Sequence, residues 1–254
     1  MNKAKLINSK LLLAVILVLF LITRLYKISE IPPSVYWDEA SIGYNAYSIA
    51  QTGRDEWGEF LPIHFRAFGE FKLPVYIYSV VPFVKVFGLD AFSVRIPSVL
   101  FSLGIIVLTY LLSKKISGSI QVGLWSSFFI SISPWFFIFS RTGYEATSGL
   151  MFYLMGIYLF LSNKKNWHIF FSTISFVLTV YSYNSFRIIV PVTILILIIV
   201  EWNNLKRIKV IPVILSILIL VLSTVPIYRL YKYDSGISRL QVVAATPQTF
   251  LKNY

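Results

Sequence analysis

Long apolar runs constrain the fold of this chain more than any other feature of its sequence. The first, from Leu11 to Lys27, has about 17 residues and would form roughly 26 Å of helix, enough to cross the hydrocarbon of a bilayer. Further apolar runs cover residues 73–87, 94–112, 120–139, 147–162, 167–183, 185–201 and 210–228. Only 13% of the residues are charged, against roughly a quarter in soluble proteins. We therefore expect an all-α polytopic membrane protein.

Basic residues lie where they would orient these spans. No small-residue cleavage site follows the first run, so we interpret it as an uncleaved span rather than a signal peptide. The basic clusters between apolar runs are Lys3, Lys5 and Lys10, then Lys114 and Lys115, Lys164 and Lys165, and Lys206, Arg207 and Lys209. Such clusters mark cytoplasmic loops. We expect a multi-pass protein of the cell membrane with a cytoplasmic N-terminus, and the net charge of +12 does not indicate a nucleic-acid partner.

The apolar runs outnumber by one the membrane crossings that the charge pattern allows. Residues 28–72 would lie outside and the Lys114 cluster inside, yet two runs separate them. The run 73–87 is short and contains two prolines and a lysine, so we expect it to lie at the outer interface or to enter the membrane and return. About seven true spans then remain. If both runs crossed, the Lys114 cluster would lie outside, which the charge rule disfavours.

The 28–72 segment would form a long first extracytoplasmic loop with juxtamembrane helices. It holds seven of the eleven acidic residues of the chain. The pattern from Asp38 to Gln51 predicts a helix with Asp38 as its N-cap and Gly53 at its end. Its apolar stripe, which we expect to rest on the membrane surface, consists of Ile42, Ala46, Ile49 and Ala50.

Asp38 and Glu39 follow Trp37 at the start of this helix. The plainest interpretation is structural, because acids in the first turn favour the helix dipole. A carboxylate just above the membrane is also where a general base would meet an acceptor from outside, and both interpretations can hold together. The chain has no cysteine, so carboxylates, bases and hydroxyls must carry any chemistry.

Two further acid–base motifs lie near the outer membrane surface. Glu70 and Lys72 could form an interfacial ion pair, or Lys72 could hold a lipid phosphate while Glu70 holds a metal or positions a reactant. Arg141 and Glu145 could form an intrahelical pair worth about 0.3–0.5 kcal/mol. An acid so close to hydrocarbon is nevertheless a functional candidate. We expect Asp38, Glu70 and Glu145 to converge on one outward-facing cavity.

The last polar motif lies between the runs 167–183 and 185–201. It contains Tyr183 and Arg187. Arg187 could be a second phosphate ligand or an interfacial anchor within the aromatic belt. His64 and His168 have no metal-ligand spacing, and we assign them no role.

The motifs occur in an order that is typical of one enzyme class. They are Trp37-Asp38-Glu39, Gly69-Glu70-Phe71-Lys72-Leu73-Pro74, Phe87-Gly88-Leu89-Asp90 with Arg95-Ile96-Pro97-Ser98, and Ser133-Pro134 with Ser140-Arg141 and Glu145. In this order, over about residues 20–190, the chain resembles the GT-C membrane glycosyltransferases. It is most similar to the protein O-mannosyltransferase and aminoarabinose-transferase branch, the glycosyltransferase 39-type proteins.

The resemblance implies transfer of one sugar from a polyprenyl phosphate to an extracytoplasmic protein, glycolipid or glycan, with inversion. It implies Asp38 as the catalytic base and Glu39 as its supporting neighbour. Lys72 would hold the donor phosphate, with Arg187 as a second partner. The site would be lined by Glu70, Arg141, Glu145 and Tyr183. Glu70 and Glu145 would be ligands of a divalent metal in members that use one, and no other cofactor is implied.

Two departures from the family pattern weaken the metal assignment. Glu145 stands where the family more often has aspartate, and Leu73-Pro74 stands where Pro-Pro commonly follows the lysine. Family members run well beyond 254 residues. We therefore expect residues 1–228 to form the N-terminal transmembrane catalytic module, and residues 229–254 to begin a second extracytoplasmic loop that is cut short.

Two other functional classes remain open at this point. A transporter or flippase of lipid-linked sugar would have similar spans, but transporters bury ionisable residues near the bilayer midplane. Here the acids gather at one face. The second class is a non-catalytic, truncated homologue of the transferases.

Overall fold

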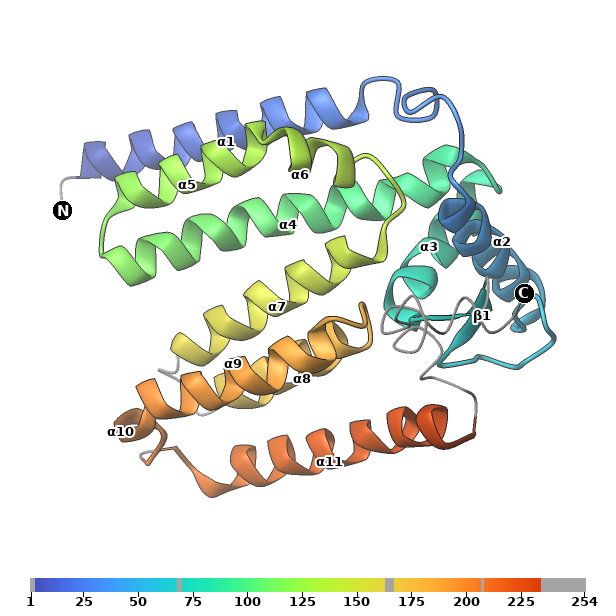
Figure 1. Cartoon of the computed structure of the whole chain (residues 1–254). Helices are drawn as coiled ribbons and strands as arrows, with labels where there is room; N and C mark the ends of the chain where they lie inside the picture. Colours follow the sequence, from blue (N-terminus) through green and yellow to red (C-terminus); the bar gives the residue numbers. More distant parts are fainter. Residues whose placement is uncertain (1–2, 68–69, 163–166, 207, 234–254) are drawn as a thin grey trace, which may run out of the picture.

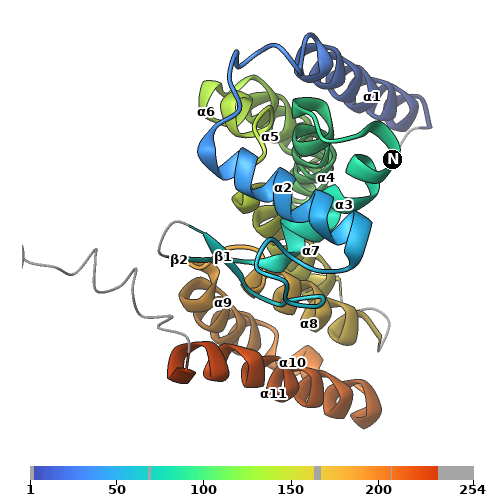
Figure 2. The ribbon, with the colours of Figure 1, turned by 90° about the vertical axis from the view of Figure 1, so that its right-hand side faces the viewer.

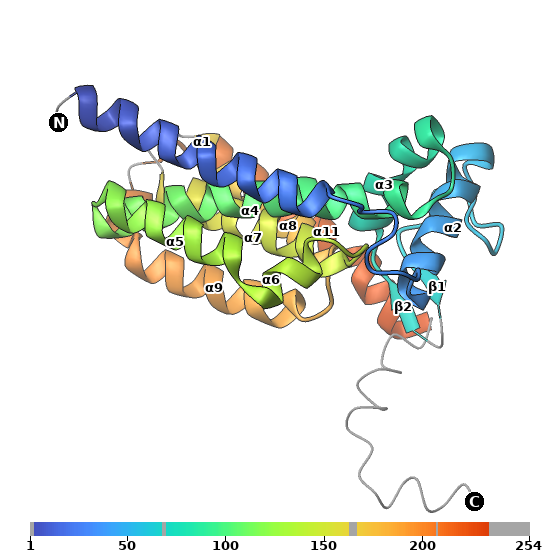
Figure 3. The same cartoon turned by 90° about the horizontal axis from the view of Figure 1, so that it is seen from above.

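A computed structural model describes residues 3–67, 70–162, 167–206 and 208–233, and shows a bundle of long helices with a small cap at one end (Figure 1). The helices that run along the bundle are α1 (Lys3–Leu25), α4 (Ala91–Ser117), α5 (Ile120–Ile132), α7 (Glu145–Leu161), α8 (Trp167–Val180), α9 (Phe186–Val200) and α11 (Val210–Tyr233). The view from above shows the same arrangement (Figure 3). The predicted all-α membrane fold is confirmed.

The long helices differ in how well they match a bilayer. Within the described residues, three segments are long and apolar enough to cross a membrane by themselves: Asn8–Leu25, Ala91–Ser117 and Val210–Leu230. The other apolar helices have between 10 and 17 residues. Large apolar side chains of α1, α9 and α11 are exposed, as for example Ile22 (60%), Ile199 (75%) and Val221 (58%). Such exposure suits a surface that faces lipid rather than water.

The predicted run 120–139 is two helices rather than one. The helix α5 ends at Ile132, and the short α6 (Pro134–Phe139) begins with a proline. Proline has no amide hydrogen to continue the helical bonds and disfavours helical geometry in the residue before it. Ser133 accordingly takes ψ 126°, and the chain bends there.

The cap consists of α2 (Trp37–Thr52), the hairpin of β1 (Phe65–Ala67) and β2 (Glu70–Lys72), and α3 (Pro74–Phe87). Figure 2 looks at this end of the molecule and shows α2 and α3 across the ends of the long helices, with the hairpin beside them. The segment 73–87 thus lies in the cap instead of running along the bundle, as its short length and prolines predict.

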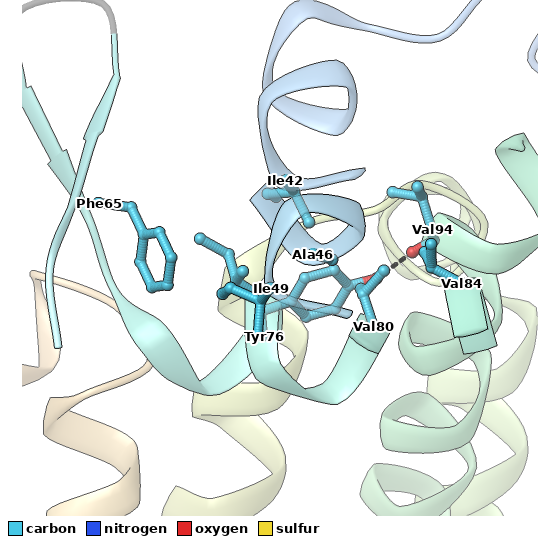
Figure 4. Packing of buried hydrophobic residues seen from close by; sticks show 9 residues of the cluster. Ile42, Ala46, Ile49, Phe65, Tyr76, Val80, Val84 and Val94 are labelled. Carbon is cyan, nitrogen blue, oxygen red and sulfur yellow. Dashed lines mark hydrogen bonds between the residues drawn. The ribbon is translucent and has the colours of Figure 1, made fainter. Parts of the chain in front are cut away.

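The apolar stripe of α2 is buried by protein and not by a membrane surface, so that part of the prediction is wrong. Ile42 and Ala46 have no exposed surface, because they pack with Tyr76 and Val80 of α3. Figure 4 shows these side chains meeting between the two helices. The helix α3, and not lipid, therefore covers the apolar stripe of α2.

The start of α2 also differs from the prediction, whereas its end agrees. Its N-cap is Tyr36 and not Asp38, because the Tyr36 amide donates to the Glu39 carboxylate at 3.1 Å and the helix begins one residue before Asp38. Gly53 ends the helix with φ 71°, and its amide donates to the Ile49 carbonyl at 2.9 Å. A left-handed glycine at this position is a common helix end.

The loops sort to the two ends of the bundle as the charge pattern predicts. The N-terminus, the turn after Lys114 and Lys115, and α10 (Trp202–Leu205) lie at the end opposite the cap (Figure 1). The predicted second loop was expected to start at residue 229, but residues 229–233 are the end of α11. The rest of that loop and the Lys164 cluster lie outside the described residues. Which end faces the cytoplasm stays a prediction.

Glycines allow α7 to approach its neighbours closely. A Cβ atom on Gly156 would lie 2.8 Å from the ring of Phe176 in α8, and one on Gly149 would lie 2.6 Å from the ring of Phe186 in α9. Small residues at such contacts are typical of helix packing in membranes, where close backbone approach replaces the hydrophobic effect.

We expect Gly156→Ala to lower the stability of the bundle by about 1–3 kcal/mol, because the added methyl group overpacks a buried contact. The measurement is thermal unfolding in detergent. The control is Gly104→Ala, whose Cβ would meet Cγ of Met151 at 2.9 Å. Methionine is flexible and can move aside, so equal losses in both variants would contradict this account of the packing.

Candidate functional site

A buried lysine joins two carboxylates where the cap meets the bundle. Lys72 Nζ donates to Oδ1 of Asp38 at 2.5 Å and lies 3.6 Å from Oε1 of Glu145. The Lys72 side chain is 5% exposed, against 23% for Asp38 and 13% for Glu145. Asp38 is thus the most accessible of three groups that come from three different elements.

The local structure explains why these three groups meet. The strand β2 ends at Lys72, which is paired with Phe65, and Pro74 then starts α3 at once. Asp38 lies in the first turn of α2 and Glu145 in the first turn of α7. The unbonded amides of a helix N-terminus favour negative charge. Two helix N-termini therefore support the two carboxylates around one ammonium group.

Glu39 has a different environment from its neighbour Asp38. It is 2% exposed, and each of its oxygens accepts two hydrogen bonds. Oε1 accepts from Arg95 Nε at 2.9 Å and from the Gly143 amide at 2.7 Å, while Oε2 accepts from Arg95 Nη2 and the Tyr36 amide, both at 3.1 Å. Because both oxygens are fully engaged, Glu39 fixes the start of α2 and so positions Asp38.

Arg95 positions Glu39, and this role was not predicted from the sequence. It has no exposed surface. Besides Glu39 it binds the carbonyl oxygens of Ile28 at 2.8 Å, Pro32 at 3.0 Å and Ser34 at 2.9 Å, all in the segment between α1 and α2. An arginine near the start of an apolar span is itself a signal, since such residues are costly and therefore usually have a role.

Arg141 has a structural position that the sequence did not predict. Its guanidinium donates to the carbonyl oxygens of Thr23 at 2.6 Å, Tyr26 at 2.7 Å and Ile31 at 3.0 Å, at the end of α1. The intrahelical pair with Glu145, one of the two alternatives for this motif, is not formed, because α7 begins at Glu145 and Arg141 is not on that helix. Arg141 thus holds the end of α1 and the segment after it, and its place in the lining of the site stays a prediction.

The loop between α8 and α9 reaches the same end of the bundle. The Tyr183 hydroxyl lies 3.3 Å from that of Tyr144, the residue before Glu145. The Tyr181 carbonyl accepts from the Val75 amide at 3.4 Å, three residues after Lys72. Burial raises the pKa of Tyr181, and the nearby positive charge of Arg187 lowers it by less. Tyr183 therefore belongs to a loop that contacts the neighbours of Lys72 and Glu145, and Arg187 lies in the first turn of α9 directly after this loop.

A chain of hydroxyl groups joins α3 and α4 to the first turn of α7, where Glu145 lies. The Tyr76 hydroxyl donates to the Val94 carbonyl at 2.9 Å (Figure 4). It also lies 2.8 Å from the Ser98 hydroxyl, which lies 3.2 Å from that of Thr147. Burial raises the pKa of Tyr76 well above its usual range, and the bond with Ser98 offsets only part of this. Tyr76 therefore stays neutral and joins α3 to α4.

The predicted metal site is not tested by the geometry. Glu70 pairs through its backbone with Ala67, but its side chain lies outside the described residues. Among the side chains that are described, no three His, Cys, Asp or Glu residues form a group that could hold a metal. Lys72, a cation, lies between Asp38 and Glu145. A metal bound by Glu70 and Glu145 stays a prediction, and no step below depends on one.

Comparison with protein families identifies a match to this chain. A family model described as dolichyl-phosphate-mannose-protein mannosyltransferase matches residues 72–228. This range covers well over half of the chain and includes Lys72, Arg95, Glu145 and Arg187, whereas Asp38 and Glu39 precede it. Neither the curated proteins nor the solved structures gave a match.

Proposed function

Because the chain belongs to the dolichyl-phosphate-mannose-protein mannosyltransferase family and is a membrane glycosyltransferase of the GT-C class, we propose that Asp38 is the general base of its reaction. In this proposal a polyprenyl phosphate carries the sugar donor, and the acceptor is an extracytoplasmic protein, glycolipid or glycan. The capped end of the bundle faces away from the cytoplasm.

The proposed reaction is a single displacement at the anomeric carbon of the donor. An acceptor hydroxyl attacks this carbon, the bond to the phosphate oxygen breaks, and the polyprenyl phosphate leaves with the bonding electrons. The acceptor proton passes to Asp38. Since one displacement occurs, the configuration at the anomeric carbon inverts.

The observation that carries this proposal is the contact between Lys72 and Asp38. The ammonium holds Oδ1 of Asp38 at 2.5 Å, so Oδ2 is the oxygen that would take the proton. A positive charge beside the base is also suited to stabilise the phosphate as it leaves, in a site that is largely shielded from water. One buried lysine would thus orient the base and bind the leaving group.

Arg187 would assist Lys72 as a second phosphate ligand, and Tyr183 would line the same space. Tyr183 and Tyr181 of the loop between α8 and α9 contact Tyr144 and Val75, which are close in the sequence to Glu145 and Lys72. Arg187 follows this loop in the first turn of α9. Family membership favours sugar transfer over the transporter and flippase that the sequence also allowed.

We expect Lys72→Met to lower kcat/KM for the polyprenyl-phosphate donor by about 10²–10³-fold, the usual loss when one donor to a developing anion is removed. The measurement is initial-rate transfer from a labelled polyprenyl-phosphate sugar in membranes. Lys85→Met is the matched control, because Lys85 is an exposed lysine of the adjacent α3. Donor kinetics that stay at the wild-type level in Lys72→Met would overturn the phosphate role.

A further inference from the structure

A pocket lies in the cap, between α2, the loop that follows it and β1. Its volume is about 380 Å³. Five of its lining residues carry polar or aromatic groups: Ser41, Tyr44, Glu56, Trp57 and Arg66. Ligand pockets usually start near 300 Å³, so this one has room for a small ligand or for one unit of a larger one.

The pocket is held in shape by hydrogen bonds within the cap. Asn45 Nδ2 donates to Glu56 Oε1 at 2.9 Å, and the Glu56 amide donates back to Asn45 Oδ1 at 3.2 Å. Trp57 Nε1 donates to the Arg66 carbonyl at 3.3 Å, which ties the indole to β1. These bonds set the wall of the pocket before any ligand arrives, and such preorganisation lowers the cost of binding.

The lining groups combine aromatic faces with hydrogen-bonding side chains. The Trp57 side chain is 63% exposed and that of Tyr44 is 52% exposed, so both rings are accessible. Glu56 supplies a carboxylate that accepts, and Arg66 supplies a guanidinium that donates. Ser41 is 9% exposed, and among the described residues its buried Oγ has no hydrogen-bond partner. A serine hydroxyl can rotate towards a ligand, and a buried one without a partner is costly.

The pocket lies close to Asp38 because both are on α2. Ser41 is three residues and Tyr44 six residues beyond Asp38, which corresponds to about 4.5 Å and about 9 Å along the helix axis. A ligand in the pocket would therefore lie about one to two helical turns along α2 from the proposed base. This separation suits a group next to the reacting hydroxyl, and not the hydroxyl itself.

We propose that this pocket binds a pyranose ring of the acceptor, so that the acceptor is a carbohydrate chain or a molecule that already carries one. The inference rests on the function proposed above. A pyranose has C–H faces that pack on the electron-rich faces of aromatic rings, and a rim of hydroxyls that pair with carboxylate, guanidinium and serine groups. Peptides are instead recognised largely through main-chain bonds to a strand edge or groove, and the polar groups of this pocket are side chains.

The test is direct binding, measured by saturation-transfer NMR on the detergent-solubilised protein. The probes are a panel of methyl hexopyranosides and a hexapeptide that contains serine and threonine. We expect sugar binding by the wild type and by Tyr47→Ala, an exposed α2 tyrosine outside the pocket. Tyr44→Ala and Trp57→Ala should bind at least 10-fold more weakly. Trp57→Phe, which keeps a ring, should bind with intermediate affinity and covers the case in which Trp57→Ala fails to fold.

Two results would overturn the proposal. One is wild-type sugar affinity in Tyr44→Ala or in the Trp57 variants, and the other is binding of the hexapeptide but of none of the hexopyranosides. Because the assay measures binding without turnover, its outcome is separate from that of the catalytic proposal. An inactive protein that still bound hexopyranosides here would leave the pocket intact and refute only the catalytic role.

Discussion

We expect Asp38→Asn to lower sugar transfer by about 10²–10⁴-fold, the usual contribution of a general base. Asparagine has nearly the same shape, and its carbonyl oxygen can still accept from Lys72, whose ammonium lies 2.5 Å from Oδ1 in the native protein. What the amide cannot do is take the acceptor proton. The loss should therefore fall on catalysis and not on folding, and the measurement is the rate of transfer at equal amounts of membrane-inserted protein.

The matched control is Glu59→Gln. Glu59 is an exposed acid of the same loop and has no place in the proposed site, so the rate of this variant should equal that of the wild type. If Asp38→Asn also transferred sugar at the wild-type rate, Asp38 would not be the base. If both variants lost activity together, the loss would reflect the charge of the loop and not proton transfer at Asp38.

Glu39→Gln is expected to lower the free energy of unfolding by about 3–5 kcal/mol, since breaking a buried ion pair leaves an uncompensated charge. Arg95 would lose its carboxylate partner inside the protein, where it has no exposed surface. The glutamine NH₂ group would also face donors, because both oxygens of Glu39 accept two hydrogen bonds each. Thermal unfolding in detergent measures the effect.

Glu30→Gln is the matched control for Glu39→Gln. Glu30 pairs with Lys27 at 2.9 Å, but the two side chains are 67% and 49% exposed. An exposed pair of this kind contributes about 0–1 kcal/mol, so unfolding should hardly change. A Glu39→Gln protein that was as stable as the wild type but inactive would mean that Glu39 acts in catalysis and not in positioning.

The membrane fold could be predicted because its main signal is local. A run of apolar residues predicts a span without any knowledge of its neighbours, and Pro74 with Pro82 marks 73–87 as different from the other runs. The division of 120–139 into two helices could also have been predicted from Pro134. These features need only the residues within one helix.

The partners of the buried charges could not be predicted, because they are far apart in the sequence. Arg95 meets Glu39 across 56 positions, and Arg141 meets Thr23 across 118. The spacing of Arg141 and Glu145 instead favoured a local pair that the structure does not have. For the same reason the burial partner of α2 could not be predicted. Its apolar stripe indicates that one side of the helix is buried, but not whether lipid or α3 buries it.

The candidate site could be predicted in part. Asp38, Lys72 and Glu145 could be singled out because charges near a membrane are few and each needs a reason. That Lys72 would lie between the two acids follows only from the hairpin, which pairs Lys72 with Phe65 and delivers it to the N-termini of α2 and α7. The pocket lined by Tyr44 and Trp57 could not be predicted, because it forms only when the loop after α2 folds back on that helix.

The central claim is tested most directly by the configuration of the product. The protein in membranes is given a polyprenyl-phosphate sugar labelled at the anomeric carbon, and the product linkage is analysed by NMR together with the released lipid. We predict one polyprenyl phosphate released for each sugar transferred, an anomeric configuration opposite to that of the donor, and loss of both signals in Asp38→Asn. A product that keeps the donor configuration, or a donor that is never consumed, would contradict the proposed mechanism.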